Sequence, residues 1–148
     1  MQVKDQIISL ELAKVLKDLG VLQKSLWYWY RYYYDKQWFI GHKEEIAFEE
    51  NPDCYSAFTV AEIGEMLPIA LDFIDDENSP YEGHRRLIEW KGVDGWWVGY
   101  IPINCKFEDF KAVQIRGKDW RIKCWAETEA DARAKMLIWL IEKEIIKV

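Results

Sequence analysis

The sequence predicts an α+β domain in which an antiparallel sheet of hairpins is covered by about three helices. Segments with helix signals and segments with hairpin signals follow one another in the order helix, hairpin, helix, two hairpins, helix. The chain also lacks the glycine-rich phosphate-binding motifs that parallel nucleotide-binding sheets carry. With 148 residues, of which 50% are hydrophobic, it can bury one core. We therefore expect residues 1–148 to form a single α+β domain.

The first element is an amphipathic helix. Ser9 is a favourable N-cap residue, and it precedes a run in which Leu12, Leu16 and Leu19 fall on one face. Gly20 is placed to end the helix, because glycine readily adopts the left-handed conformation that follows many helices. We expect the Ser9 hydroxyl to be used in capping this helix.

Large aromatic side chains dominate the first hairpin. Residues 26–34 read Leu-Trp-Tyr-Trp-Tyr-Arg-Tyr-Tyr-Tyr, a composition that favours a strand, and a turn at 35–36 leads into a second strand at 37–40. Side chains alternate between the two faces of a strand, and tyrosine hydroxyls favour water. We therefore assign Trp27 and Trp29 to the core and the opposite face to solvent. The solvent-facing tyrosines are Tyr28, Tyr30, Tyr32 and Tyr34.

The middle of the chain contains a second helix between two loops. Residues 41–58 are acidic and weakly periodic, which indicates a loop with room for one short edge strand. Thr59 and Glu62 have the spacing of a capping box and begin a helix that Pro68 ends or kinks. Residues 69–74 fit either a strand or a distorted helical turn, and both interpretations stay open.

Two further hairpins follow. Residues 87–91 and 96–101 flank a turn at 92–95 that has glycine at both corners, which makes this the clearest hairpin in the sequence. A second hairpin is predicted over 111–126, with its turn at 116–119.

The last helix is predicted to run from the N-cap Thr128 to about residue 147, with Asp131 as the acid of a capping box. Its main apolar face consists of Ala130, Ala134, Leu137, Ile141 and Ile145. A second, roughly opposite apolar stripe consists of Ala132, Met136, Trp139 and Ile146. Two apolar faces indicate a helix that either lies between layers or presents one face to a partner, and both interpretations stay open. In the second case the stripe is a partner-binding surface, such as a homodimer interface.

Charge and cysteine content restrict the function classes. The chain has 26 acidic and 20 basic side chains; residues 1–83 hold the acidic excess, and residues 84–148 are mildly basic. Strong nucleic-acid binders usually carry a large positive excess, so nucleic acid is not the leading partner. No run of about 20 apolar residues spans a membrane, and no leader pattern follows Met1. We expect a cytoplasmic protein without membrane contact.

The residues that could support catalysis or metal binding do not form a known motif. The three cysteines, Cys54, Cys105 and Cys124, have neither disulfide nor zinc-ligand spacing. His42 and His84 stand outside metal-ligand motifs, and no serine occupies a nucleophile elbow. We therefore expect no catalytic residue, no cofactor and no metal. A hydrolase would require one of the histidines to lie in a cleft beside an acid or a serine.

A basic and aromatic set of side chains gives an alternative function, that of a weak single-stranded nucleic-acid-binding module. Exposed aromatic rings can stack on bases while neighbouring cations contact phosphates. The candidate residues in the first hairpin are Tyr30, Arg31 and Tyr32. Those in the later basic stretch, close to Trp120 and Trp125, are Arg116, Lys118, Arg121 and Lys123.

Three blocks of sequence, in this order, carry a family resemblance. They are Ile-Ser-Leu-Glu-Leu-Ala-Lys at 8–14 with Leu16 and Gly20, Phe-Thr-Val-Ala-Glu-Ile-Gly-Glu-Met-Leu-Pro at 58–68, and Ala-Asp-Ala-Arg-Ala-Lys-Met-Leu-Ile-Trp-Leu at 130–140. The chain resembles small proteins of unknown function encoded by bacteriophages and prophages. The resemblance implies no activity, cofactor or functional residue. Because the last helix has two apolar faces and no catalytic set is assembled, we expect a non-enzymatic accessory protein of a phage or integrated element in the bacterial host cytoplasm. We expect it to act through protein contacts, with a homodimer as one form.

Overall fold

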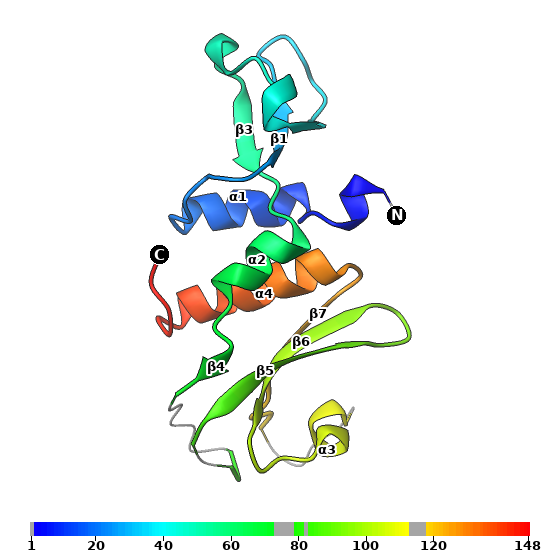
Figure 1. Cartoon of the computed structure of the whole chain (residues 1–148), viewed down its shortest axis with the longest axis vertical. Coiled ribbons are helices and arrows are strands. Elements are labelled where there is room, and N and C mark those ends of the chain that lie inside the picture. Colours follow the sequence, from blue (N-terminus) through cyan, green and yellow to red (C-terminus); the bar gives the residue numbers. More distant parts are fainter. Residues whose placement is uncertain (1, 73–78, 82, 113–117) are drawn as a thin grey trace.

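The computed structural model of the chain describes residues 2–72, 79–81, 83–112 and 118–148. Within these residues it contains two antiparallel sheets, of three and four strands, and four α-helices. The helices α1 (Leu10–Asp18), α2 (Val60–Met66) and α4 (Glu129–Glu142) form a layer between the two sheets (Figure 1). The predicted α+β class is confirmed, although the strands are divided between two sheets. None of the helices formed by the described residues is long and apolar enough to span a membrane.

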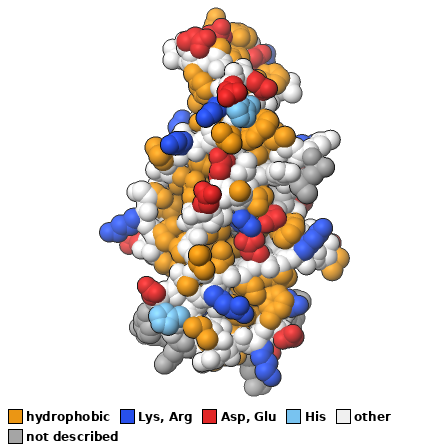
Figure 2. Space-filling view, viewed as in Figure 1, with side chains coloured by type: hydrophobic (Ala, Val, Ile, Leu, Met, Phe, Trp, Pro, Cys, Tyr) orange, Lys and Arg blue, Asp and Glu red, His pale blue; other side chains and the backbone are white. Residues whose placement is uncertain are grey.

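The three-stranded sheet forms one end of the molecule (Figure 1). It consists of β1 (Trp27–Arg31), β2 (Phe39–His42) and β3 (Asp53–Ser56), in the order β2-β1-β3. The pairing of β1 with β2 confirms the first predicted hairpin, and β3 is the short edge strand for which the 41–58 segment has room. Figure 2 shows carboxylates gathered around this end of the molecule.

The two faces of β1 differ less than the sequence predicts. Trp29 packs against the main core, and its indole N–H donates a hydrogen bond to the Ile8 carbonyl oxygen over 2.9 Å, as expected for a core residue. Trp27, in contrast, is half-buried and meets His42 edge to face, so its assignment to the core is wrong.

The tyrosine face of β1 is also partly covered. The Tyr32 hydroxyl accepts a hydrogen bond from the Ala47 backbone N–H, because the segment after β2 folds back over this face in two short 3-10 turns at 43–45 and 48–50. As a result Tyr28, Tyr30 and Tyr32 are half-buried, whereas Tyr34 is 61% exposed. The assignment of the tyrosine face to solvent is therefore correct for Tyr34, whereas the other three tyrosines are only partly exposed.

The four-stranded sheet lies on the other side of the helices. Its strands are β4 (Ala70–Leu71), β5 (Arg85–Lys91), β6 (Trp96–Pro102) and β7 (Ile122–Ala126), in the order β4-β5-β6-β7. The pairing of β5 with β6 confirms the clearest predicted hairpin. Of the two interpretations left open for 69–74, the strand is correct at β4, and the rest of that segment from 73 onward lies outside the described residues.

Of the last predicted hairpin, the second strand is present as β7, whereas Lys111, the first residue of the predicted first strand, is helical. Residues Phe107–Lys111 form the short helix α3, and β7 pairs with β6. The physical reason is packing: Phe110 is fully buried against the sheet, and Phe107 packs against the same cluster of side chains. The spacing of these two rings matches one turn of helix. The last three residues of the predicted first strand and the first half of its turn, together 113–117, lie outside the described residues.

Helix α4 is buried between layers, which decides between the two interpretations of its apolar faces. It packs on β6 and β7 on one side and on α1 and α2 on the other. Ala132 and Met136 have no exposed surface, and Trp139 and Ile146 pack against the same core. The expected partner-binding stripe is therefore part of the core of this chain. The helix ends at Glu142, earlier than predicted, and Glu144 has a left-handed φ of 57°.

The predicted helix caps are confirmed in part. Thr59 and Glu62 form the capping box, each side chain accepting a hydrogen bond from the other residue's backbone N–H. Thr128 accepts from the Asp131 N–H, but the Asp131 carboxylate accepts from the backbone N–H of Ser9, at 2.7 Å. The Ser9 hydroxyl makes no capping hydrogen bond, so its predicted role is wrong. Asp131 instead ties the start of α1 to α4.

Candidate ligand-binding site

Three tryptophans form a row across the outer face of the four-stranded sheet. Trp90 of β5 lies opposite Trp97 of β6, and Trp97 lies opposite Trp125 of β7. Alternation along the strands places Val98 and Tyr100 on the other face, where they are buried against the helices. The outer face thus presents indole rings on three adjacent strands.

One half of this outer face is covered by α3 and the segments around it. Ile101, Cys105, Phe110 and Trp120 form a second buried cluster there, and Trp90 packs at its border. Gly99 makes this packing possible, because a Cβ at that position would lie 3.0 Å from atoms of the Phe110 ring. The edge of the covered half, formed by α3 and the segments around it, therefore makes a wall beside the tryptophan row.

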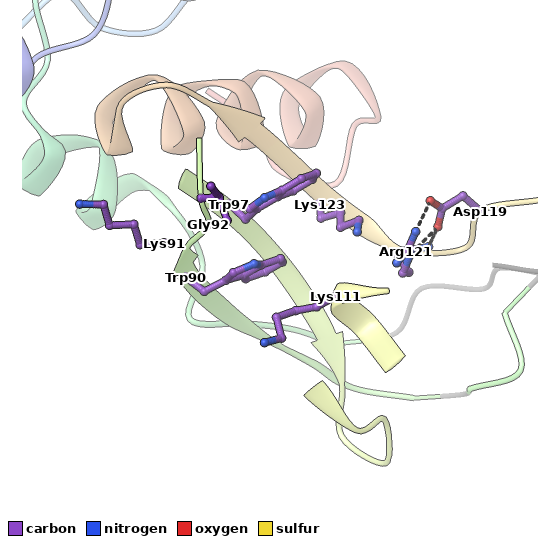
Figure 3. Close-up of a pocket in the computed structure, with 9 residues that line it drawn as sticks. Trp90, Lys91, Gly92, Trp97, Lys111, Asp119, Arg121 and Lys123 are labelled. Carbon is purple, nitrogen blue, oxygen red and sulfur yellow. Dashed lines mark hydrogen bonds and ion pairs between the residues drawn. The ribbon is translucent and has the colours of Figure 1, made fainter. Parts of the chain in front are cut away.

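A groove with a volume of about 740 Å³ lies along this wall (Figure 3). We call it the tryptophan groove. Its lining includes the Trp90 and Trp97 rings and, among the described residues, four basic residues and one acidic residue. The ammonium group of one of them, Lys91, points away from the two rings and lies 6.0 Å from the Trp96 centroid (Figure 3). The charged residues are Lys91, Lys111, Asp119, Arg121 and Lys123.

The rings of the groove stand in a defined order. Trp90 and Trp97 are parallel within 5°, with their centroids 5.7 Å apart, and Figure 3 shows the two planes side by side. The ammonium group of Lys123 lies 4.7 Å from the Trp97 ring centroid. Phe107 meets Trp90 edge to face at 5.4 Å, and the ammonium group of Lys111 lies over Phe107 at 4.4 Å. Three consecutive aromatic rings thus lie between two cations, Lys123 at one end and Lys111 at the other.

Arg121 supports the groove wall. Its guanidinium makes two hydrogen bonds to the Asp119 carboxylate, at 2.9 and 3.0 Å, and further bonds to the carbonyl oxygens of Phe110 and Ala112. Only 3% of the Arg121 side chain is exposed. Hydrogen bonding to Arg121 lowers the pKa of Asp119 from its ordinary value. Because its donors are engaged, Arg121 holds the wall together, and a ligand would meet the lysines instead.

Lys123 is a partly desolvated cation. Burial, followed by the nearby charge of Arg121, lowers the pKa of Lys123 from its ordinary value. Its ammonium group contacts the Phe110 carbonyl oxygen at 3.4 Å but has no ion pair with a carboxylate among the described residues. An anion entering the groove would therefore meet a positive charge that the described carboxylates do not neutralise directly.

The structure separates the residues predicted for nucleic-acid binding. Arg121 and Lys123 line the tryptophan groove. Lys118 is exposed and directly precedes Asp119, another residue of the groove lining. Arg116 lies outside the described residues. Tyr30 and Arg31 belong to β1 of the other sheet, across the helical layer (Figure 1), and Tyr32 directly follows that strand. The two sets therefore do not form one site as the sequence suggested. Trp120 is buried, whereas Trp125 is 38% exposed.

Trp90 and Trp97 were missed as site residues by reasoning from sequence, although a signal for them exists. The hairpin around 92–95 was predicted, and counting outward from its two glycines pairs Trp90 with Trp97. Paired residues share a face. The contribution of Phe107 and Lys111 could not be found in this way, because both lie on helix α3. This helix is brought next to the sheet only by tertiary packing.

The remaining polar candidates are engaged in local structure. The Ser25 hydroxyl donates to Glu62 at 2.9 Å, but this carboxylate also accepts the backbone N–H groups of Leu26 and Thr59. His42 Nδ1 accepts the Glu44 backbone N–H, and His84 lies 3.8 Å from the Asp72 carboxylate with both side chains mostly exposed. The described part of the chain holds no group of three or more His, Cys, Asp or Glu side chains able to bind a metal ion.

The chain was compared with protein-family models, with curated proteins and with solved structures, and none of the three comparisons finds a match.

Proposed function

We propose that this protein is a non-enzymatic module that binds single-stranded nucleic acid in the tryptophan groove. One observation carries the proposal: two parallel indole rings and the cations Lys111 and Lys123 line one groove of about 740 Å³. Single-strand binders combine aromatic rings, on which bases stack, with positive charges that follow the backbone. The proposal keeps the alternative function inferred from the sequence and replaces Tyr30 and Tyr32 with Trp90 and Trp97.

We expect Lys123 to move from the Trp97 ring to a phosphate group when a nucleotide binds in the groove. One side of Trp97 faces Trp90, and the Lys123 ammonium group lies over the ring. A base can stack on Trp97 if it displaces this ammonium group, which then becomes available to the adjacent phosphate. A cation–π contact is worth only about 0.5–2 kcal/mol, so a base and a phosphate together can replace it. Because burial already removes part of the hydration of Lys123, its pairing with a phosphate requires less further desolvation than that of a fully exposed lysine.

The thiol and carboxylate chemistry near the sheet supports a binding role over a catalytic one. Burial raises the pKa of Cys124 to about 11 and raises that of Cys105 above its ordinary value, so both thiols favour the unreactive protonated form at neutral pH. Asp119 is held by Arg121. These groups are thus poorly suited to act as a nucleophile or a general base.

The accessory role of a phage or prophage protein that acts through protein contacts stays a prediction. It was based on three helical blocks and on an apolar stripe of the last helix. Because Ala132 and Met136 of that stripe are buried within the chain, the stripe no longer supports a homodimer. A cytoplasmic location likewise stays a prediction.

The test is a fluorescence titration of the purified chain with a single-stranded dT12 oligonucleotide at about 20 mM salt. We expect Trp97→Ala to weaken binding roughly 5- to 150-fold, because stacking on one aromatic ring is worth about 1–3 kcal/mol per base. Trp27→Ala is the matched control, since Trp27 is a half-buried tryptophan of the other sheet, and its affinity should match the wild type. Far-ultraviolet circular dichroism checks that both variants fold.

Two results would reject this function. The first is the absence of dT12 binding by the folded wild-type chain at low salt. The second is equal binding of a neutral oligosaccharide such as cellohexaose with no dependence on salt, because indole rings also pack against sugars. Salt-sensitive binding of dT12 that depends on Trp97 would support the proposal.

A further inference from the structure

A second group of cations and aromatic rings lies at the three-stranded sheet. We call it the Trp38 cluster, and it consists of Lys14, Lys17, Arg31, Trp38 and Tyr55. The Lys14 ammonium group lies 5.2 Å from the Trp38 centroid and 5.8 Å from the Tyr55 centroid. The Arg31 guanidinium lies 4.7 Å from the Trp38 centroid, and the Lys17 ammonium group 4.8 Å from that of Tyr55. The two ring centroids are 5.5 Å apart.

The fold brings these side chains together from distant parts of the sequence. Lys14 and Lys17 are three residues apart on α1, so they project from the same side of the helix. Tyr55 lies on β3, which packs on α1, and Arg31 ends β1 opposite Asp53. The Lys17 ammonium group also donates to the Cys54 carbonyl oxygen at 3.3 Å. The positions of the cations are thus defined by three elements.

The Trp38 cluster carries more positive charge than its carboxylate neighbour neutralises. Arg31 pairs with Asp53 at 3.1 Å. Among the described residues, no carboxylate lies within 4.0 Å of the ammonium group of Lys14 or Lys17. An aromatic face attracts a cation but cancels none of its charge. Two of the three positive charges therefore lack an anionic partner in the described part of the chain, on a protein whose net charge is -6.

We propose that the Trp38 cluster is a second contact site for the same nucleic-acid strand and that it binds phosphate groups. This inference rests on the proposed function. Two cations, Lys14 and Arg31, lie over the Trp38 ring, so a base would have to displace two cation–π contacts there, against the single contact of Lys123 at Trp97. The cluster thus contacts the backbone without reading the base, whereas the tryptophan groove stacks on bases. The two sites lie on opposite sides of the helical layer (Figure 1).

The first arm of the test uses inorganic tripolyphosphate and the indole N–H signals in a ¹H–¹⁵N spectrum. The Trp38 signal, identified by its loss in Trp38→Phe, should shift on addition of tripolyphosphate. The shift should be lost in the double variant Lys14→Gln/Lys17→Gln. It should persist in Lys4→Gln/Lys147→Gln, which removes the same charge from exposed residues outside the cluster. An unmoved Trp38 signal in the wild type, or an equal response in the two double variants, would overturn the phosphate site.

The second arm measures the salt dependence of dT12 binding. Each lost phosphate contact should reduce the slope of log K against log salt concentration by about 0.7 for a single strand, so Lys14→Gln/Lys17→Gln should reduce it by about 1.4. The control Lys4→Gln/Lys147→Gln should leave the slope unchanged. Trp97→Ala should weaken dT12 binding while leaving the tripolyphosphate response of Trp38 intact.

The two arms separate the two proposals. If dT12 binds with Trp97 dependence but both double variants have the wild-type slope, the second contact is rejected and the proposed function stands. If tripolyphosphate moves the Trp38 signal but dT12 does not bind, the cluster takes a free phosphate compound instead. That outcome would overturn the contact to a strand together with the proposed function.

Discussion

Arg133 of α4 and Glu89 of β5 form an ion pair beneath the four-stranded sheet, with 2.8 Å between Nη2 and Oε2. The same guanidinium contacts Glu129 at 2.7 Å and the Val60 carbonyl oxygen at 2.8 Å. Gly64 of α2 leaves the space, because a Cβ there would collide with the guanidinium. Arg133 thus ties β5, α2 and α4 together within the core.

Replacing Arg133 with methionine should destabilise the protein by about 3 kcal/mol. The change removes one positive charge and leaves the Glu89 and Glu129 carboxylates close together and largely buried, with 21% and 25% of their side chains exposed. Urea unfolding at pH 7 measures the loss. Lys147→Met, at an exposed lysine, is the control and should change the free energy of unfolding by less than about 0.5 kcal/mol. Equal effects of the two substitutions would show that the ion pair contributes nothing.

The raised pKa of Glu89 should be detectable in the pH dependence of the free energy of unfolding. Burial raises the pKa of Glu89 above its ordinary value, and this effect exceeds the opposing attraction of Arg133. The folded protein therefore binds a proton more readily than the unfolded chain, so the stability contributed by this group falls as pH rises through the window between the unfolded and the folded pKa. Urea unfolding of wild type and Glu89→Gln between pH 4 and 7 isolates this effect. We expect the stability of the wild type relative to the variant to decrease with increasing pH, and a constant difference would contradict the assignment.

Gly99 should be intolerant of a side chain. A Cβ at this position would lie 2.7 Å from the Ile122 carbonyl oxygen and 3.0 Å from the Phe110 ring. Gly99→Ala must therefore shift β7 or the wall of the tryptophan groove, and we expect a loss of about 1–3 kcal/mol in thermal unfolding followed by circular dichroism. At Gly92 the nearest atom would be 3.3 Å away, so Gly92→Ala should cost less. The reverse ranking would be inconsistent with this packing.

The Cys124 thiol should react slowly with a disulfide reagent in the folded protein. Its pKa of about 11, raised by burial from an ordinary value near 9, reduces the thiolate fraction at pH 8 roughly 100-fold. In the variant Cys54→Ser/Cys105→Ser, reaction of Cys124 with a disulfide reagent should be at least 100-fold slower in the folded protein than in urea. The rate should still be rising at pH 10. A plateau below pH 9 would mean that Cys124 is more exposed to water than the structure indicates.

Local signals in the sequence were sufficient for several elements of the fold. The capping box at Thr59, the N-cap Thr128 and the hairpin closed by Gly92 and Gly95 depend on residues only a few positions apart. Each satisfies its own hydrogen bonds or turn geometry nearby, so the sequence pattern predicts it without knowledge of the rest of the chain.

The features that were missed depend on distant contacts. The Asp131 carboxylate accepts a hydrogen bond from Ser9, 122 residues away, and no local pattern identifies that partner. Helix α3 packs with Phe110 against Gly99, which has no side chain to prevent this contact. Gly99 belongs to β6, so the local sequence of α3 does not show this space. The candidate site also depends on distant contacts, since Lys111 and Trp97 line the same groove only once α3 has packed on the sheet. The burial of Met136 likewise follows from two layers that the helix sequence alone does not reveal.

The central position of α4 has a consequence for the order in which the protein can be assembled during synthesis. The main core includes Trp29 from one sheet, Val98 from the other and the alanines of α4. Every strand of both sheets precedes α4 along the chain, so the ribosome releases them before the helix that completes their shared interior. Nascent chains without α4 expose apolar strand surfaces at both ends, which favours aggregation or chaperone binding. Stable folding must therefore wait until translation has passed residue 142 and this segment has left the exit tunnel.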